Sequence, residues 1–199
     1  MSSPDVTWHA GELTAPERWS ALGTSGATLW LTGLPSSGKS TIAAAAEARL
    51  VRSGRPALRL DGDNLRHGLN SDLGFSAADR AENVRRTAHA AALLAEAGVV
   101  AVASLVSPYE RDRAAARAAH AERGLPFFEV HVSTPLEECE RRDTKGLYAR
   151  ARGGELKGMT GIDDPYEVPR AAELVLDGRR PLEEAVDRLL ALLAQADAA

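Results

Sequence analysis

The sequence predicts an α/β fold in three layers, a parallel sheet of about five strands with helices on both faces. Short apolar runs alternate with helix-forming segments along the chain, the order that builds a parallel sheet. One of these runs, 99–105, is apolar apart from Ser104, as expected of a strand that is buried on both faces. A glycine-rich loop separates the first run from the helix-forming segment after it, at the edge where such sheets place their ligands.

The expected elements follow from local signals. The turn Ser53-Gly54-Arg55-Pro56 ends one helix, and Ser76 with Asp79 resembles a capping box that begins another. Gly98 closes that second helix. Strands are expected at 27–32, 57–60, 99–105, 127–132 and 174–176, and helices at 41–50, 76–97, 109–123, 135–142 and 181–195. The last helix carries apolar residues three or four positions apart, which predicts one buried face.

The chain has 199 residues, and we expect a single domain over 27–199. Residues 1–26 are expected to form an N-terminal extension that packs on this domain, with Trp8 and Trp19 as candidate anchors. The segment 143–164 contains several glycines and charges without a clear period, which predicts a mobile lid instead of core.

Composition excludes several classes of protein. The net charge is −4, so no general basic field favours nucleic acid. The single cysteine, Cys139, rules out an intramolecular disulfide framework and a cysteine-based metal cluster. No run of 18 apolar residues predicts a membrane span, and the first residues lack the pattern of a signal peptide. We therefore expect a cytoplasmic protein.

The glycine-rich loop matches G-x-x-x-x-G-K-[ST] at every fixed position and lies between a strand and a helix. This context predicts a P-loop NTPase-type fold with ATP and Mg²⁺ as cofactors, because loop amides and a helix N-terminus together favour phosphate. The alternative is a Gly/Ser-rich turn that only caps the helix. Lys39 is expected along the β- and γ-phosphates and the Ser40 hydroxyl on Mg²⁺. The predicted ATP-binding residues are Gly33, Leu34, Pro35, Ser36, Ser37, Gly38, Lys39, Ser40 and Thr41.

The phosphoryl acceptor is expected at the carboxyl ends of the other strands. Asp61, in Asp61-Gly62-Asp63-Asn64, would accept the proton of an attacking hydroxyl or orient Mg²⁺ through water, although an Asp/Gly turn that caps the next helix explains it equally well. Ser107 follows the third strand, where serine is usually a turn residue. A basic cluster and two lid residues complete the candidates: Arg66, His67, Arg80, Asn83, Arg85 and Arg86, with Lys145 and Arg152.

Several ordered blocks resemble the adenylyl-sulfate kinase (APS kinase) family, whose members phosphorylate the 3′-hydroxyl of adenosine 5′-phosphosulfate (APS). The resemblance covers nearly the whole chain. Its blocks are Leu29–Leu34 with the P-loop, Asp61–Asn70, Phe75-Ser76 with Asp79-Arg80 and Glu82–Arg86, Ser107–Tyr109, Cys139–Asp143, Lys145–Tyr148 and Thr160–Tyr166. A P-loop is common, but this set at matching separations is specific.

The resemblance implies a role for each matching residue. Asp61 would be nearest the 3′-hydroxyl, and Ser107 matches a position assigned in the family to a phosphoserine intermediate. Transfer at a P-loop needs no covalent step, because positioning and electrostatics do most of the work. The implied substrate-binding residues are Asp61, Asp63, Arg66, Phe75, Arg80, Asn83, Val106, Ser107, Lys145, Gly146, Leu147 and Met159.

Two positions depart from the family pattern. The loop has Pro35-Ser36-Ser37 where the family usually has Ser, Gly and a small residue. Met159 stands where the family usually has Phe, and in the family that Phe encloses the adenine of APS together with the residue matched by Phe75. We expect Met159 to form one wall of that enclosure here.

Two other functions compete with this one. Another small-molecule P-loop kinase, acting on a sugar acid, shikimate or an antibiotic hydroxyl, would need the P-loop and the strand-end Asp but not the arginines. A nucleotide-binding module without turnover would need no Asp61. Candidate partners are the small-molecule substrate, a second copy of the chain and ATP sulfurylase, with no nucleic acid and no membrane.

Overall fold

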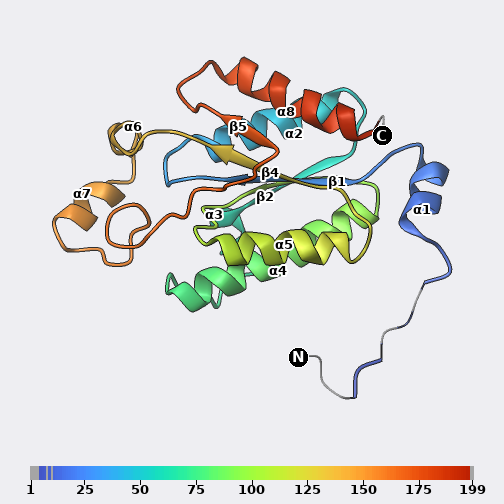
Figure 1. The fold of residues 1–199 in the computed structure, drawn as a ribbon, viewed down its shortest axis with the longest axis horizontal. Coiled ribbons are helices and arrows are strands. Elements are labelled where there is room, and N and C mark those ends of the chain that lie inside the picture. The colour runs from blue at the N-terminus through green and yellow to red at the C-terminus, as the bar shows by residue number, and fades with distance from the viewer. Residues whose placement is uncertain (1–4, 8, 10, 198–199) are drawn as a thin grey trace.

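The computed structural model describes residues 5–7, 9 and 11–197 (Figure 1). Five strands form one all-parallel sheet in the order β2-β3-β1-β4-β5, as the sequence predicted. The strands are β1 (Ala27–Thr32), β2 (Ala57–Asp61), β3 (Val100–Ser104), β4 (Phe127–Val132) and β5 (Leu174–Leu176). The strand order reverses beside β1, so a crevice is expected at its carboxyl end, where the loop 33–38 lies.

Helices cover both faces of the sheet. They are α1 (Ala15–Leu22), α2 (Lys39–Arg52), α3 (Gly62–Leu65), α4 (Ala77–Glu96), α5 (Glu110–Ala121), α6 (Leu136–Arg141), α7 (Leu147–Arg152) and α8 (Leu182–Asp197). In Figure 1, α2 and α8 lie on one face and α4 and α5 on the other. The three-layer α/β prediction is confirmed.

Each face has its own hydrophobic core. On the side of α2 and α8, Leu29 and Leu31 of β1 pack with Ile42 and with Leu189 and Leu193 of α8. The face of α8 predicted from its periodicity is therefore the buried one. On the other side, Trp30, Val84, Ala88, Ala101 and Phe127 are among the residues that pack between the sheet, α4 and α5.

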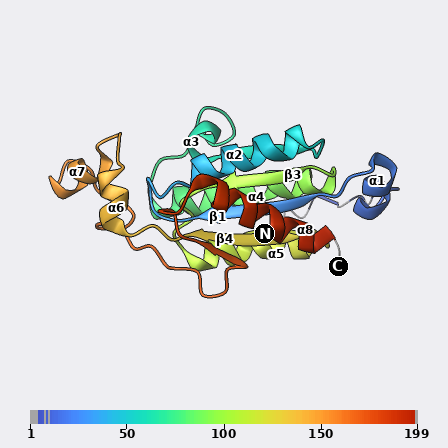
Figure 2. The same cartoon turned by 90° about the horizontal axis from the view of Figure 1, so that it is seen from above.

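The two ends of the sheet carry different appendages. Both views place α6 and α7 beyond one end and α1 beyond the opposite end (Figures 1 and 2). In α1, the Trp19 indole donates to the Ala95 carbonyl at 3.0 Å and packs against Leu125. Trp8, the other candidate anchor, lies outside the described residues. No helix in the described part of the chain is long and apolar enough to span a membrane.

The segment 143–164 has more structure than its sequence predicted. It contains α7, and its apolar side chains form a small cluster of their own, separate from the two main cores. Three residues of this cluster are fully buried: Cys139, Tyr148 and Met159. We call the cluster, which also includes Leu34, Leu136, Leu147, Ala151, Leu156 and Ile162, the lid cluster. The sequence did not predict α7, because its six residues and the tight turns beside it show no clear period.

Candidate active site

The loop 33–38 wraps tightly between β1 and the start of α2. A Cβ on Gly33 would lie 2.6 Å from the Val132 carbonyl oxygen, so this position has room only for glycine. Gly38 has φ 102° and forms the N-cap of α2, and Ser36 has φ 59°, a conformation that costs a non-glycine residue about 1–2 kcal/mol. The loop therefore adopts a curled backbone directly before a helix N-terminus, the arrangement that directs amides at an anion.

Lys39 is the first residue of α2 and its side chain folds back over the loop. Its Nζ donates to the Leu34 carbonyl at 2.6 Å and to the Ser37 hydroxyl at 3.3 Å, and the residue is only 7% exposed. Burial lowers the pKa of Lys39 to about 8, against the opposing influence of Cys139 and the nearby carboxylates. An anion in the loop would raise this pKa again, because an opposite charge nearby favours the protonated amine.

Asp61 is the last residue of β2, and its carboxylate serves two purposes. Its Oδ1 accepts from the Asp63 amide at 3.1 Å and caps α3, while its Oδ2 accepts from the Ser104 hydroxyl at 3.0 Å. Burial alone would raise the pKa of Asp61, but hydrogen bonds from Ser40, Ser104 and the amides of Asn64 and Asp63 outweigh it and lower the pKa. The capping interpretation of Asp61 is therefore confirmed, and its lowered pKa favours the carboxylate form, while its role toward a hydroxyl or Mg²⁺ stays a prediction.

The bond between Ser40 and Asp61 fits a Mg²⁺ site. Mg²⁺ in nucleotide enzymes keeps several waters and uses one or two protein oxygens together with phosphate oxygens. The Ser40 hydroxyl and the ionised Asp61 are such oxygens, and they lie within hydrogen-bonding reach of one another at the mouth of the loop. The donor set therefore fits the predicted metal, and the assignment of Ser40 as direct ligand and Asp61 as partner through water stays a prediction.

Arg66 and Arg80 come together around Phe75. The Arg66 guanidinium lies 4.2 Å from the centre of the Phe75 ring and donates to the Leu73 and Gly74 carbonyls, at 2.8 and 2.9 Å. Burial lowers the pKa of Arg66, and the nearby charge of Arg80 lowers it further. Two guanidinium groups this close form an electropositive site, which an oxyanion would relieve.

The other arginines of the predicted basic cluster do not join this pair. Arg85 binds Glu82 through two hydrogen bonds of 2.7 Å, and Arg86 bridges Glu82 and Asp72. Because i,i+3 and i,i+4 partners lie on the same helix surface, these charges neutralise one another on the outside of α4. His67 is exposed.

Asn83 and Ser107 are both buried in the site region. The side-chain Oδ1 of Asn83 accepts from the side-chain Nδ2 of Asn70 at 2.8 Å. The Ser107 hydroxyl accepts from the Trp30 indole at 3.2 Å, and the Ser107 backbone has φ 38°. The Val106 carbonyl accepts from the Thr32 hydroxyl at 2.7 Å, so the loop after β3 is fixed to the residue that precedes the P-loop.

Contacts join the lid to the strand ends. Lys145 forms an ion pair with Asp63, both of them exposed, and this contact raises the pKa of Lys145. Arg80 donates to the Gly158 carbonyl at 2.9 Å. Arg152 instead pairs with Glu140 at 2.5 Å, and its predicted approach to a phosphate stays a prediction.

The lid cluster also touches the P-loop. The Tyr148 hydroxyl donates to the Pro35 carbonyl at 2.9 Å, and Leu34 and Leu147 are both part of the cluster. Gly146 has φ 66° and forms the N-cap of α7. Leu34 and Pro35, two variable positions of the P-loop, are thus points where the loop contacts the lid.

The expected enclosure of an adenine by Phe75 and Met159 stays a prediction, and the burial of Met159 argues against it. Phe75 is 62% exposed, as a stacking surface requires. Met159 is 5% exposed and packs with Cys139 and Tyr148 in the lid cluster.

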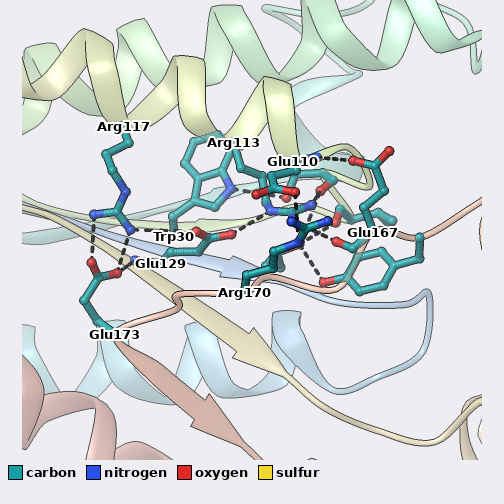
Figure 3. A network of polar contacts seen from close by, with 12 residues as sticks. Trp30, Glu110, Arg113, Arg117, Glu129, Glu167, Arg170 and Glu173 are labelled. Carbon is teal, nitrogen blue, oxygen red and sulfur yellow. Dashed lines mark hydrogen bonds and ion pairs between the residues drawn. The ribbon is translucent and has the colours of Figure 1, made fainter.

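Arg113 is a site-region residue that the sequence analysis missed (Figure 3). This buried guanidinium donates to Glu129 at 2.6 Å, to the Ser107 carbonyl at 2.8 Å and to the Glu167 carbonyl at 2.7 Å. It therefore ties the loop after β3 to the chain leaving the lid. A signal was available: Arg113 shares one helical face with the buried Ala116 and His120, and a buried arginine requires acceptors.

The two halves of the cleft suit two anions. The end of β1 offers a curled backbone and a buried lysine to a chain of phosphates, while the ends of β2 and α4 offer arginines to a second ligand. A parallel α/β sheet with this division of the cleft is that of a P-loop kinase.

The comparisons with known proteins define the class further. The family model for adenylylsulphate kinase matches residues 25–177. The adenylyl-sulfate kinase of Penicillium chrysogenum is 49% identical over 196 residues, covering 94% of this chain and 93% of that protein. The bifunctional enzyme CysN/CysC of Mycobacterium tuberculosis is 49% identical over 191 residues, which are 96% of this chain but only 30% of that longer protein.

A solved structure agrees. The M. tuberculosis APS kinase CysC in complex with AMPPNP and APS superposes with a TM-score of 0.84 at 51% identity, covering 86% of this chain and 99% of that one. The chain belongs to the adenylylsulphate kinase family.

Proposed function

We propose that this chain transfers the γ-phosphoryl group of ATP to the 3′-hydroxyl of APS, giving ADP and 3′-phosphoadenylyl sulfate. The observation that carries the proposal is the Arg66–Arg80 pair around an exposed Phe75. An aromatic face beside two guanidinium groups suits a purine that carries a phosphosulfate. A sugar acid or shikimate offers no base for the ring.

The donor half positions ATP. The loop amides and Lys39 hold the β- and γ-phosphates, and Lys39 is freed for this by leaving the Leu34 carbonyl, its present acceptor. Ser40, and Asp61 through water, would hold Mg²⁺, which would supply neutralisation of the phosphate charge.

The acceptor half positions the hydroxyl. Asp61 accepts the proton of the 3′-hydroxyl of APS while the hydroxyl oxygen forms a bond to the γ-phosphorus of ATP. The bond from that phosphorus to the β,γ-bridging oxygen breaks at the same time, and ADP leaves. The ionised state of Asp61, favoured by its hydrogen bonds, equips it for this step. Lys145 and the lid contacts at Gly158 exclude water, so that the phosphoryl group goes to APS and not to solvent.

The environment of Ser107 supports a positioning role and not a phosphoserine. Its hydroxyl is buried and already accepts from Trp30, and Arg113 holds its carbonyl. Direct in-line transfer needs positioning and electrostatics only. Treating the enzyme with ATP in the absence of APS should leave Ser107 unmodified in a peptide mass spectrum.

One assay tests the proposed function against its rivals. The protein is supplied with ATP, Mg²⁺ and, in separate reactions, APS, gluconate, shikimate or an aminoglycoside, and ADP and phosphorylated product are measured by mass spectrometry. We expect product with APS alone. Preferential phosphorylation of another acceptor would identify a different kinase, and ATP binding without product from any acceptor would favour the non-catalytic module.

Self-association is also part of the proposal. A related enzyme of Thiobacillus denitrificans is described as a hexameric APS kinase. The matching segment is 30% of the bifunctional CysN/CysC protein, so a related segment occurs within a longer enzyme, and we extend the proposal to ATP sulfurylase as a partner. Light scattering on the purified chain, alone and mixed with ATP sulfurylase, measures both associations.

A further inference from the structure

Two buried asparagines form a pair between the loop after α3 and helix α4. Asn70 is 0% exposed and Asn83 is 8% exposed, and the Asn70 Nδ2 donates to the Asn83 Oδ1 at 2.8 Å. Asn70 is fixed by its backbone as well: its amide donates to the Leu65 carbonyl at 2.8 Å and its carbonyl accepts from the Leu73 amide at 3.2 Å. Asn70 therefore presents its side-chain amide to Asn83 from a rigid position.

The pair has a defined polarity. Within the part of the chain that the structure describes, the Asn70 Oδ1 is buried without a hydrogen-bond partner. Reversing both amides would instead bury the Asn70 NH₂ group without an acceptor. An orphaned carbonyl oxygen is tolerated better than an orphaned N–H, so the observed polarity is the favoured one.

This polarity decides what Asn83 can recognise. The Asn83 Oδ1 accepts a hydrogen bond from Asn70. No described protein group accepts from the Asn83 Nδ2, and this nitrogen is not a buried atom without a partner. Asn83 thus keeps an NH₂ donor available to a ligand. Arg80 lies three residues earlier on α4, on the same side of the helix, and also presents only donors.

We propose that Asn70 is a positioning residue that orients the side-chain amide of Asn83 so that its NH₂ group faces the substrate APS. At this position APS must then present an atom that accepts a hydrogen bond. The inference rests on the proposed function, because it requires Asn83 to meet APS. The group recognised is an oxyanion oxygen or a ring nitrogen of the acceptor nucleotide. Asn70 itself touches no ligand and acts through Asn83 alone.

The sharpest variant is Asn70→Asp. A carboxylate can only accept, so it draws the Asn83 NH₂ to itself and turns the Asn83 carbonyl toward the acceptor. We expect the KM for APS to rise about tenfold or more, the loss expected for a hydrogen bond to a charged group, while the KM for ATP stays near its wild-type value.

Two further variants separate orientation from charge and from folding. Ser71→Asp adds the same charge at the exposed neighbouring position and should leave both KM values near wild type. Asn70→Ala frees the Asn83 amide to populate both orientations, so the KM for APS should rise only about twofold. If Asn70→Asp fails to fold, Asn70→Ala still tests the idea.

A double-mutant cycle completes the experiment. In an Asn83→Ala background, Asn70→Ala and Asn70→Asp should change the KM for APS no further, because the amide through which they act is gone. A further rise in that background, or equal rises in the KM values for APS and ATP, would overturn the role of Asn70. Failure of the proposed function would be seen separately, because the unaltered protein would then not phosphorylate APS.

Discussion

The donor and acceptor halves of the cleft are built in different ways. The donor half is one continuous stretch, 33–41, and the Lys39 amine bonds to residues only five and two positions away. In the acceptor half the bonded groups lie far apart in the chain: Lys145 and Asp63 are separated by 82 residues, and Arg80 and Gly158 by 78.

This difference predicts how each half responds to change. The donor half depends on a fixed backbone and one buried amine, so it should fail when that amine is removed, and its contacts with the lid lie at Leu34 and Pro35. The acceptor half depends on side chains carried by β2, α4 and the lid, so it should lose affinity for one substrate while ATP binding survives. The following predictions, from the largest expected effect to the smallest, test that separation.

Lys39→Ala should fold normally and lose most of its activity. The expected loss in kcat is about 10²–10³-fold, the usual cost of removing one electrostatic contact in the transition state. The measurement is kcat with a circular-dichroism spectrum for folding. Lys157→Ala, which removes an exposed lysine of the lid, is the matched control and should stay near wild type. Near-normal turnover of folded Lys39→Ala would remove the loop from the mechanism.

Arg80→Ala should raise the KM for APS about 10- to 100-fold and leave ATP binding nearly unchanged. A charge-assisted hydrogen bond is worth ~1.5–3 kcal/mol, and Arg80 also holds the lid carbonyl of Gly158. Arg66→Ala should act in the same direction. Arg85→Ala, which removes an exposed arginine already paired with Glu82, is the control on the same helix. Equal losses of ATP and APS affinity would assign Arg80 to the fold or to the donor half.

Met159→Phe should destabilise the lid cluster without tightening APS binding. The methionine is buried, so a larger ring overpacks its site and costs about 2 kcal/mol, a fall of roughly 4–8 °C in Tm for a chain of this size. Met159→Leu, of similar volume, should cost less. Thermal melts and APS titrations decide the matter. Tighter APS binding by Met159→Phe at an unchanged Tm would instead place this side chain against the adenine.

Raising the pH should weaken ATP binding to the free enzyme as Lys39 loses its proton. Its pKa is lowered by burial to about 8, so affinity should fall roughly tenfold between pH 7 and pH 9. Calorimetric titrations with ATP measure this, and Lys39→Met should show no such dependence. Folding stability should show the opposite trend. Between pH 8 and the ordinary lysine pKa of 10.5 the unfolded chain binds more protons, so this residue's contribution to stability increases with pH.

The sequence by itself determined the sheet and the donor half. Apolar runs located all five strands, with 27–32, 127–132 and 174–176 matching to the residue, because buried parallel strands need continuous apolar residues. The P-loop could be recognised because its chemistry lies in consecutive residues: glycines for the backbone and a lysine at the start of the helix. Asp61 was predictable as a strand-end residue, but its two simultaneous bonding roles were not.

Only the tertiary structure shows how the charged residues of the predicted acceptor half are arranged. By residue type and spacing alone Arg66, Arg80, Arg85 and Arg86 are equivalent, and only the family resemblance singled out the first two. In the fold, the first two gather around Phe75 and the last two pair with acidic neighbours on the outside of α4. The buried roles of Arg113, Asn70 and Met159 were likewise decided there. Each depends on partners brought close from distant parts of the chain, and local sequence patterns do not encode such contacts.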